Sequence, residues 1–183
     1  MLIRSVSSDS GLLQSWPDGG PSRLWEASGI GEGYSTVAGV GERIYTTGLI
    51  EGDSVITALN AAGEIVWQQV NGKAWKGSYP GTRSTPTIDD GLLYHMNGYG
   101  NIVCLQADSG EVEWSVDVLK EFDGKNIMWG YSESLLVVGD KVICSPGGER
   151  VGMVALHKKT GEVIWESTGA KGGPGYSSPI LVD

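Results

Sequence analysis

The feature that most constrains this chain is a stretch of eleven residues that recurs along it. It reads A-L-H-K-K-T-G-E-V-I-W over residues 155–165 and C-L-Q-A-D-S-G-E-V-E-W over residues 104–114. A copy one residue shorter, A-L-N-A-A-G-E-I-V-W, covers residues 58–67. The tryptophans that end these copies, together with Trp25 upstream, are spaced 42, 47 and 51 residues apart. A period of about 40–50 residues is typical of a four-stranded propeller blade.

A second marker repeats in step with the tryptophans. It reads Gly-Tyr-Ser at residues 33–35, 130–132 and 175–177, and Arg83-Ser84-Thr85-Pro86 occupies the remaining place. After each marker we expect a first strand, at residues 36–40, 85–88, 133–138 and 179–182. Turns then lead to second strands (43–46, 92–96, 141–144), apolar third strands (55–59, 102–105, 153–156) and half-buried fourth strands that carry the tryptophans. Sustained helical periodicity is absent, so the sequence predicts an all-β fold of four-stranded antiparallel blades.

The strand pattern divides the chain into incomplete and complete blades. Residues 1–32 form an N-terminal segment with an outer strand at 22–27, complete blades cover 33–69, 82–118 and 131–168, and residues 175–183 hold the first strand of the next blade. An open array exposes sheet edges, which propellers avoid by closing the ring. We therefore expect residues 1–183 to be a partial propeller, which is either a piece of a longer chain or a half-ring that pairs with a second copy.

Charge and hydropathy exclude several classes of partner. The net charge of −9 disfavours nucleic acid, because phosphate binding requires a basic face. No run of residues is apolar enough to span a membrane, and the first ten residues lack the apolar core of a signal peptide.

The eleven-residue unit resembles the tryptophan-docking motif of the pyrroloquinoline quinone (PQQ) family of eight-bladed β-propellers. That motif has Ala first, Asp third, Thr or Ser sixth, Gly seventh and Trp eleventh; the third position differs here, being Asn60, Gln106 or His157. The resemblance implies that the tryptophans pack flat on the neighbouring blade, beside small residues and glycine turns. The residues expected to make these structural contacts are Trp25, Ala58, Trp67, Gly110, Trp114, Ala155, Gly161 and Trp165.

The chemistry of the quinone enzymes does not carry over to these residues. The alcohol-oxidising members of the family stack PQQ between a tryptophan and a disulfide of adjacent cysteines, and they hold Ca²⁺ with oxygen ligands. Cys104 and Cys144 lie forty residues apart, and His95 and His157 belong to different blades. We therefore predict no catalytic residue, metal site or cofactor in this segment, with PQQ and Ca²⁺ expected only if the chain belongs to a dehydrogenase.

The better functional candidates lie in the connections between a tryptophan strand and the next first strand. In propellers these loops gather around the mouth of the central channel, and loops on a rigid scaffold often carry binding residues. Alternatively, their aromatic side chains only pin the loops to the propeller. The residues expected at this channel mouth, which we call the mouth face, are Tyr34, Trp75, Tyr79, Arg83, Trp129, Tyr131, Glu133 and Tyr176.

These observations favour a non-catalytic binding or scaffold module that contacts a protein partner. The resemblance points to the periplasmic propeller lipoprotein of the outer-membrane assembly machinery, and so to an exported protein. Two alternatives remain open. The chain could be part of a PQQ-dependent alcohol dehydrogenase of the polyvinyl-alcohol type whose cofactor ligands lie in other blades. It could also be an extracytoplasmic sensor domain that binds a small ligand at the mouth face.

Overall fold

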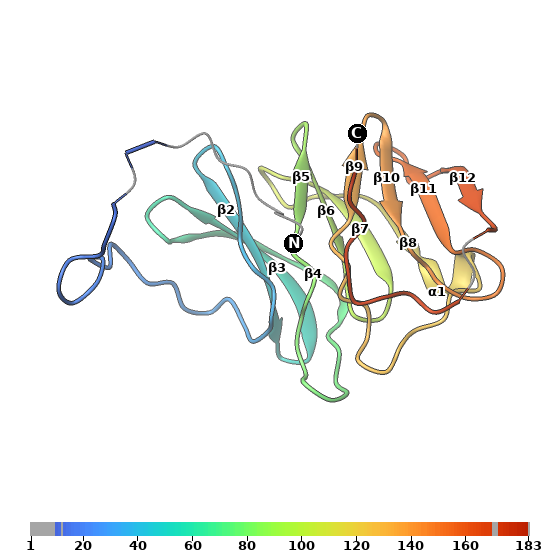
Figure 1. Ribbon diagram of the computed structural model, residues 1–183, viewed down its shortest axis with the longest axis horizontal. Coiled ribbons are helices and arrows are strands. Elements are labelled where there is room, and N and C mark those ends of the chain that lie inside the picture. Colours follow the sequence, from blue (N-terminus) through green and yellow to red (C-terminus); the bar gives the residue numbers. More distant parts are fainter. Residues whose placement is uncertain (1–9, 12, 170–171, 183) are drawn as a thin grey trace.

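The computed structural model describes residues 10–11, 13–169 and 172–182, and within them three antiparallel sheets stand side by side (Figure 1). Blade 1 contains β1 (Ala38–Val40), β2 (Arg43–Ile50), β3 (Asp53–Asn60) and β4 (Ile65–Lys73). Blade 2 contains β5 (Thr87–Asp89), β6 (Leu92–Met96), β7 (Asn101–Gln106) and β8 (Val112–Asp117). Blade 3 contains β9 (Leu136–Val138), β10 (Lys141–Cys144), β11 (Met153–His157) and β12 (Val163–Ser167). The all-β class and the architecture of an incomplete propeller ring are confirmed.

Burial follows the position of each strand within its blade. The third strands β3, β7 and β11 are mostly apolar runs whose central residues are buried. The fourth strands β4, β8 and β12 are largely exposed along the outer edge. This gradient explains why the third strands read as continuous apolar runs and the outer strands as polar–apolar alternation.

Two segments that were expected to be strands are not strands. Residues 22–27 and 179–182 are described, but they have no ladder partner among the described residues. Strand geometry depends on such a partner, since an isolated extended segment leaves its backbone groups to solvent. Trp25 nevertheless packs on blade 1 as a fourth-strand tryptophan would, so the segment occupies the expected place without the expected pairing.

One short helix also departs from the expected strand. The apolar alternation through Val118 predicted a longer outer strand, but β8 ends at Asp117 and α1 (Val118–Glu121) follows. The Asp117 carboxylate accepts hydrogen bonds from the backbone N–H groups of Leu119 and Lys120, which caps the helix. Val118 is fully buried, and so it contributes to the core from the first turn of α1.

The hydrophobic core lies between blades. Blade 1 and blade 2 share a cluster formed by Tyr45, Ile56, Ala58, Leu93, Val103, Leu105 and Ala107. Blade 2 and blade 3 share a larger cluster that includes Leu92, Tyr94, Met96, Trp114, Phe122, Val142, Cys144 and Leu156. Since each core is an interface between blades, the contacts that join blades also determine the stability of the fold.

Candidate binding site at the channel mouth

The joint between consecutive blades is built from a tryptophan that lies on a glycine of the next blade. An added Cβ at Gly110 would lie 2.7 Å from the Trp67 ring, and one at Gly161 would lie 2.8 Å from the Trp114 ring. Both glycines have positive φ, which side chains also disfavour. Glycine at this turn therefore permits both the left-handed backbone conformation and the close approach of the indole ring.

The first and last tryptophans differ in what they contact. A Cβ at Gly63 would lie 2.5 Å from the Trp25 ring, so this N-terminal indole lies on blade 1 in the same manner. Trp165 keeps 36% of its surface exposed, against 9% for Trp114. Ala58 and Ala155 are fully buried, directly opposite Trp67 and Trp165 in the strand register. These two positions lack room for a large side chain.

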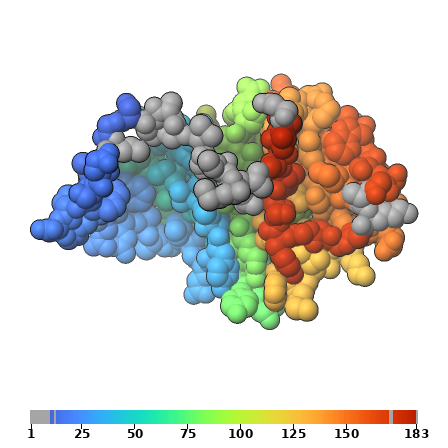
Figure 2. Space-filling model, in the orientation of Figure 1, coloured from blue at the N-terminus to red at the C-terminus, as the bar shows by residue number. Residues whose placement is uncertain are grey.

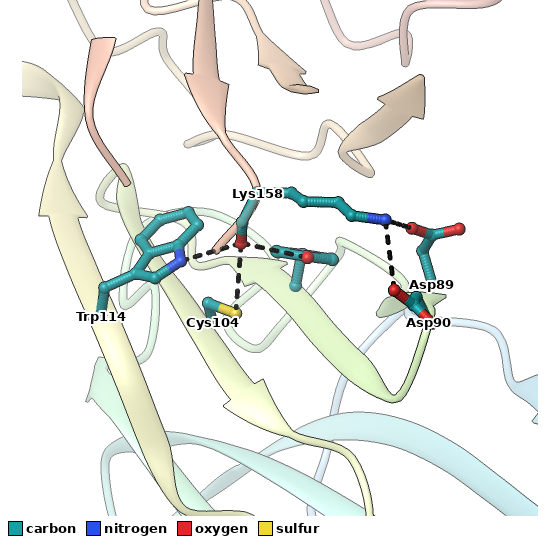
Figure 3. A network of polar contacts seen from close by, with 6 residues as sticks. Asp89, Asp90, Cys104, Trp114 and Lys158 are labelled. Carbon is teal, nitrogen blue, oxygen red and sulfur yellow. Dashed lines mark hydrogen bonds and ion pairs between the residues drawn. The ribbon is translucent and has the colours of Figure 1, made fainter. Parts of the chain in front are cut away.

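A backbone carbonyl completes each joint. The Lys158 carbonyl accepts hydrogen bonds from Trp114 Nε1 at 3.0 Å, from the Tyr94 hydroxyl at 3.1 Å and from Cys104 Sγ at 3.8 Å (Figure 3). The Lys158 ammonium also contacts Asp89 at 2.7 Å and Asp90 at 3.7 Å. Cys104 is therefore a buried structural thiol, and burial raises its pKa to about 12.

The joint between blades 1 and 2 has the same geometry. The Ala107 carbonyl accepts from Trp67 Nε1 at 3.0 Å and from the Tyr45 hydroxyl at 3.3 Å. The Tyr45–Trp67 and Tyr94–Trp114 ring pairs both have centroids 6.1 Å apart. The sequence reasoning overlooked these tyrosines, although both stand at the third position of a second strand.

A second overlooked set joins the inner edges of the blades. Thr36 N donates to Thr85 Oγ1 at 3.1 Å, Thr85 N to Ser134 Oγ at 3.0 Å, and Ser134 N to Ser178 Oγ at 2.9 Å. Each hydroxyl thus accepts from the equivalent residue of the preceding blade. A small hydroxylated residue follows shortly after every Gly-Tyr-Ser or Arg-Ser marker. This repeated residue was the sequence signal from which the series of hydrogen bonds could have been predicted.

The long connections project from the same edge of the molecule, where 73–83 and 122–131 lie beside each other (Figures 1 and 2). On this mouth face Arg83 lies against one of two aromatic pairs. Its guanidinium lies 5.6 Å from the Tyr34 ring centroid, and Tyr79 packs edge-on against Tyr34 at 6.5 Å. The second pair is Trp129 and Tyr176, whose ring centroids are 5.2 Å apart. The structure thus brings five of the expected residues into two contacting groups, and Tyr176 of the second group is near enough to influence Arg83.

Arg83 is held in place by its own loop. Its Nη1 donates to the Gly81 carbonyl at 3.3 Å, and its Nη2 donates to the carbonyls of Ser78 at 3.1 Å and Tyr79 at 2.5 Å. Partial burial lowers the pKa of Arg83, while the nearby phenols of Tyr34 and Tyr176 raise it. The guanidinium remains charged and is held by its loop beside the Tyr34 ring.

Two residues expected at the mouth face are buried instead, which corrects the prediction for both. Tyr131 is 1% exposed, and its hydroxyl donates to the Pro146 carbonyl at 2.5 Å. Glu133 is also 1% exposed and accepts from Ser145 N at 3.0 Å. Burial raises the pKa of Glu133 to about 7. Tyr131 belongs to the core cluster shared by blades 2 and 3, and Glu133 is hydrogen-bonded to the backbone of blade 3.

Trp75 also has a different place from the one expected. Its ring is half-buried against Tyr99, at a centroid distance of 5.2 Å. Added Cβ atoms at Gly77, Gly98 and Gly130 would each lie within 2.8 Å of Trp75. The indole is therefore wedged among glycines of three segments, and it pins the loop rather than capping the mouth face.

The described residues do not fit PQQ or a metal ion. Cys104 and Cys144 are separate, buried free thiols on β7 and β10, so they cannot supply the disulfide of adjacent cysteines on which the quinone would stack. Within the described ranges, no group of three or more His, Cys, Asp or Glu side chains is placed to hold a metal. His95 is buried and contacts Asn71 Nδ2 through Nδ1 at 3.0 Å, and burial lowers its pKa to about 3.

Four-stranded blades joined by indole–glycine contacts define a β-propeller of the PQQ-like repeat class. Residues 52–181 match the family described as outer membrane protein assembly factor BamB, and the chain belongs to that family. In the part of the chain that the structure describes, no helix has the length and apolar character required to cross a membrane.

Individual similar proteins are of three kinds: a quinoprotein dehydrogenase, BamB and a computationally designed protein. A quinoprotein ethanol dehydrogenase of Pseudomonas aeruginosa is 28% identical over 117 residues, which is 60% of this chain but 18% of that enzyme. The crystal structure of BamB from Moraxella catarrhalis superposes with a TM-score of 0.54 at 22% identity, covering 81% of this chain and 40% of that one. The computationally designed Ika4 protein gives a TM-score of 0.60 at 11% identity, covering 89% and 88% of the two chains. The match therefore spans less than a fifth of the dehydrogenase.

Proposed function

We propose that this chain is a non-catalytic propeller module of the cell envelope that binds a protein partner through its mouth face. The observation that carries the proposal is the convergence of Tyr34, Tyr79, Arg83, Trp129 and Tyr176 on one exposed surface. The four aromatic rings are between 42% and 67% exposed. Aromatic and arginine side chains contribute much of the binding energy at protein interfaces. The family description, an assembly factor of the outer membrane, supports both the location and the mode of action.

Photo-crosslinking on the full-length protein in its source cells tests this function. A photoreactive benzoyl-phenylalanine replaces Tyr79 on the mouth face or Val66 on β4, an exposed control position on the outer edge. We expect a discrete protein adduct from position 79, reduced by the additional change Trp129→Ala, and no such adduct from position 66. Equal adducts from both positions, or adducts insensitive to Trp129→Ala, would contradict binding through the mouth face.

Similarity to a quinoprotein ethanol dehydrogenase supports a second candidate function, in which the chain forms part of a PQQ-dependent alcohol dehydrogenase. Titration of the full-length protein with PQQ and Ca²⁺, followed by tryptophan quenching and dye-coupled alcohol oxidation, separates the two functions. Saturable quenching with turnover would overturn the scaffold proposal. Small-ligand sensing at the same surface would instead give binding without turnover and without a protein adduct.

Self-association of the chain is a separate proposal. The exposed ring of Trp165 on blade 3 offers an apolar surface of the kind that a further blade covers at the other joints. Static light scattering of the 183-residue chain tests whether two copies pair through such surfaces. A monomeric mass across the accessible concentration range would contradict pairing.

A further inference from the structure

We infer that Arg83 makes the mouth face a receptor for a single carboxylate that a partner presents beside an apolar or aromatic side chain. This inference rests on the proposed function and names the chemistry that the surface recognises. The carboxylate would come from an Asp or Glu side chain, or from a chain terminus, within a segment of the partner protein.

The first argument is that Arg83 has unused hydrogen-bonding capacity. A guanidinium carries five N–H donors, and the three bonds to loop carbonyls leave about two of them free. None of the ion pairs among the described residues involves Arg83, although the chain has a net charge of −9. An arginine that is partly buried without a carboxylate partner among the described residues of so acidic a chain is complementary to an acidic group from outside.

The second argument is that the guanidinium is already ordered before any ligand arrives. Its loop carbonyls fix the direction of its plane, and the Tyr34 ring lies beneath it at 5.6 Å. Binding therefore requires little further loss of side-chain entropy, which otherwise weakens an exposed ion pair. Charge-assisted hydrogen bonds from a fixed guanidinium are both stronger and more directional than those of a free side chain.

The third argument concerns what surrounds the charge. Arg83 lies against the Tyr34 ring, which packs on Tyr79. Tyr176 is near enough to influence Arg83 and pairs with Trp129, and Met128 is 78% exposed in the same loop as Trp129. These apolar surfaces suit a ligand that is mostly apolar around one negative charge. The excess of acidic residues in the chain disfavours a polyanion, because its additional charges would be repelled.

A matched pair of small probes tests the inference on the full chain without any substitution. N-acetyl-phenylalanine presents a carboxylate beside an aromatic ring, and N-acetyl-phenylalanine amide differs only in lacking that charge. In a ¹⁵N chemical-shift titration, we expect both to shift the Trp129 indole signal, with the acid binding at least about tenfold more tightly. Added salt should weaken the acid and leave the amide unchanged.

Two arginine variants complete the test. Arg83→Met should reduce the affinity for the acid to that for the amide. Arg150→Met is the control, because Arg150 also lies over an aromatic ring, that of Phe122 at 5.8 Å, but is already paired with Glu166. We expect this control to keep the preference for the acid. Should Arg83→Met disturb its loop and lose both probes, the acid–amide comparison on the unchanged protein still decides.

The outcomes distinguish this inference from the proposed function. If both probes bind equally and Trp129→Ala abolishes both, the mouth face binds ligands but the carboxylate assignment is wrong. Binding of inorganic phosphate as tight as that of the acid would likewise overturn the assignment, since it would show a general anion site. Should neither probe shift any signal of the mouth face while the position-79 adduct forms, the proposed function stands and the inference fails.

Discussion

The joint between blades can be tested by separating steric contact from backbone strain at a single glycine. Gly161 has φ of +74°, and an added Cβ would lie 2.8 Å from the Trp114 ring. Gly91 has φ of +77°, but a Cβ there would meet no atom within 4 Å. Gly91→Ala thus measures strain alone, whereas Gly161→Ala measures strain together with the clash against the indole.

The magnitudes differ enough to be resolved. A left-handed backbone conformation costs an alanine about 1–2 kcal/mol, and this cost applies to both variants. Overpacking a buried contact adds about 1–3 kcal/mol, and only at Gly161. We expect Gly91→Ala to lower the free energy of unfolding by about 1–2 kcal/mol and Gly161→Ala by about 2–5 kcal/mol.

Urea unfolding followed by tryptophan fluorescence gives both free energies under identical conditions. The native Gly161→Ala protein should also emit at longer wavelength than Gly91→Ala, because Trp114 must shift from its position over the turn. Gly110→Ala, with φ of +76° and a Cβ distance of 2.7 Å to Trp67, provides an independent repeat at the preceding joint. Equal destabilisation by all three variants would refute the argument that the indole–glycine contact carries interblade energy.

Three further predictions follow from buried groups. Burial raises the pKa of Glu133 to about 7, above its value of about 4.5 in the unfolded chain. The contribution of Glu133 to the free energy of unfolding is therefore complete below pH 4.5 and is lost as the pH rises through 7. Glu133→Gln should remove that loss, as measured by urea unfolding at several pH values; an unchanged pH profile would contradict this. Ser134→Ala leaves Thr85 N without its acceptor and should cost about 1–3 kcal/mol in the same assay, against a negligible change for Ser22→Ala at an exposed position of the N-terminal segment. Cys104 and Cys144 are buried and have raised pKa values, so a thiol reagent should modify them only as fast as the protein unfolds. Rapid modification of the native protein would show that these thiols are accessible.

The strands could be predicted because each blade repeats one pattern of burial. The apolar third strands and the indole–glycine unit recur three times. A strand assignment that is ambiguous in one blade is therefore resolved by the equivalent residues of the other two. Trp114 and Gly161 show the limit of this reasoning: the repeat indicates that both are structural, but only the structure shows that they touch each other across the joint.

Side-chain direction at the mouth face could not be predicted in the same way. Tyr34, Tyr131 and Tyr176 hold equivalent places in the sequence, yet Tyr131 turns inward to the Pro146 carbonyl and Tyr34 stays exposed. The Tyr131 ring lies against Gly100 of blade 2, whereas the Tyr34 ring lies beside Arg83 and Tyr79, and these contacts are not written in the repeat. Arg83 was predicted at the mouth face because it holds the place of the tyrosine in the repeated marker, but its hydrogen bonds to three loop carbonyls were not evident from the sequence.

The hydroxyl contacts from Thr36 to Ser178 give the array a direction. Every link donates from the earlier blade and accepts at the later one, so the two faces of a blade are never interchangeable. Blades joined head to tail can be added to the array through the same interface, provided that each added blade supplies one backbone N–H donor and one hydroxyl acceptor. A gene in which the segment 82–130 is duplicated in tandem should therefore encode a longer arc with the same curvature. Lengthening by internal duplication is thus open to this architecture at little structural cost.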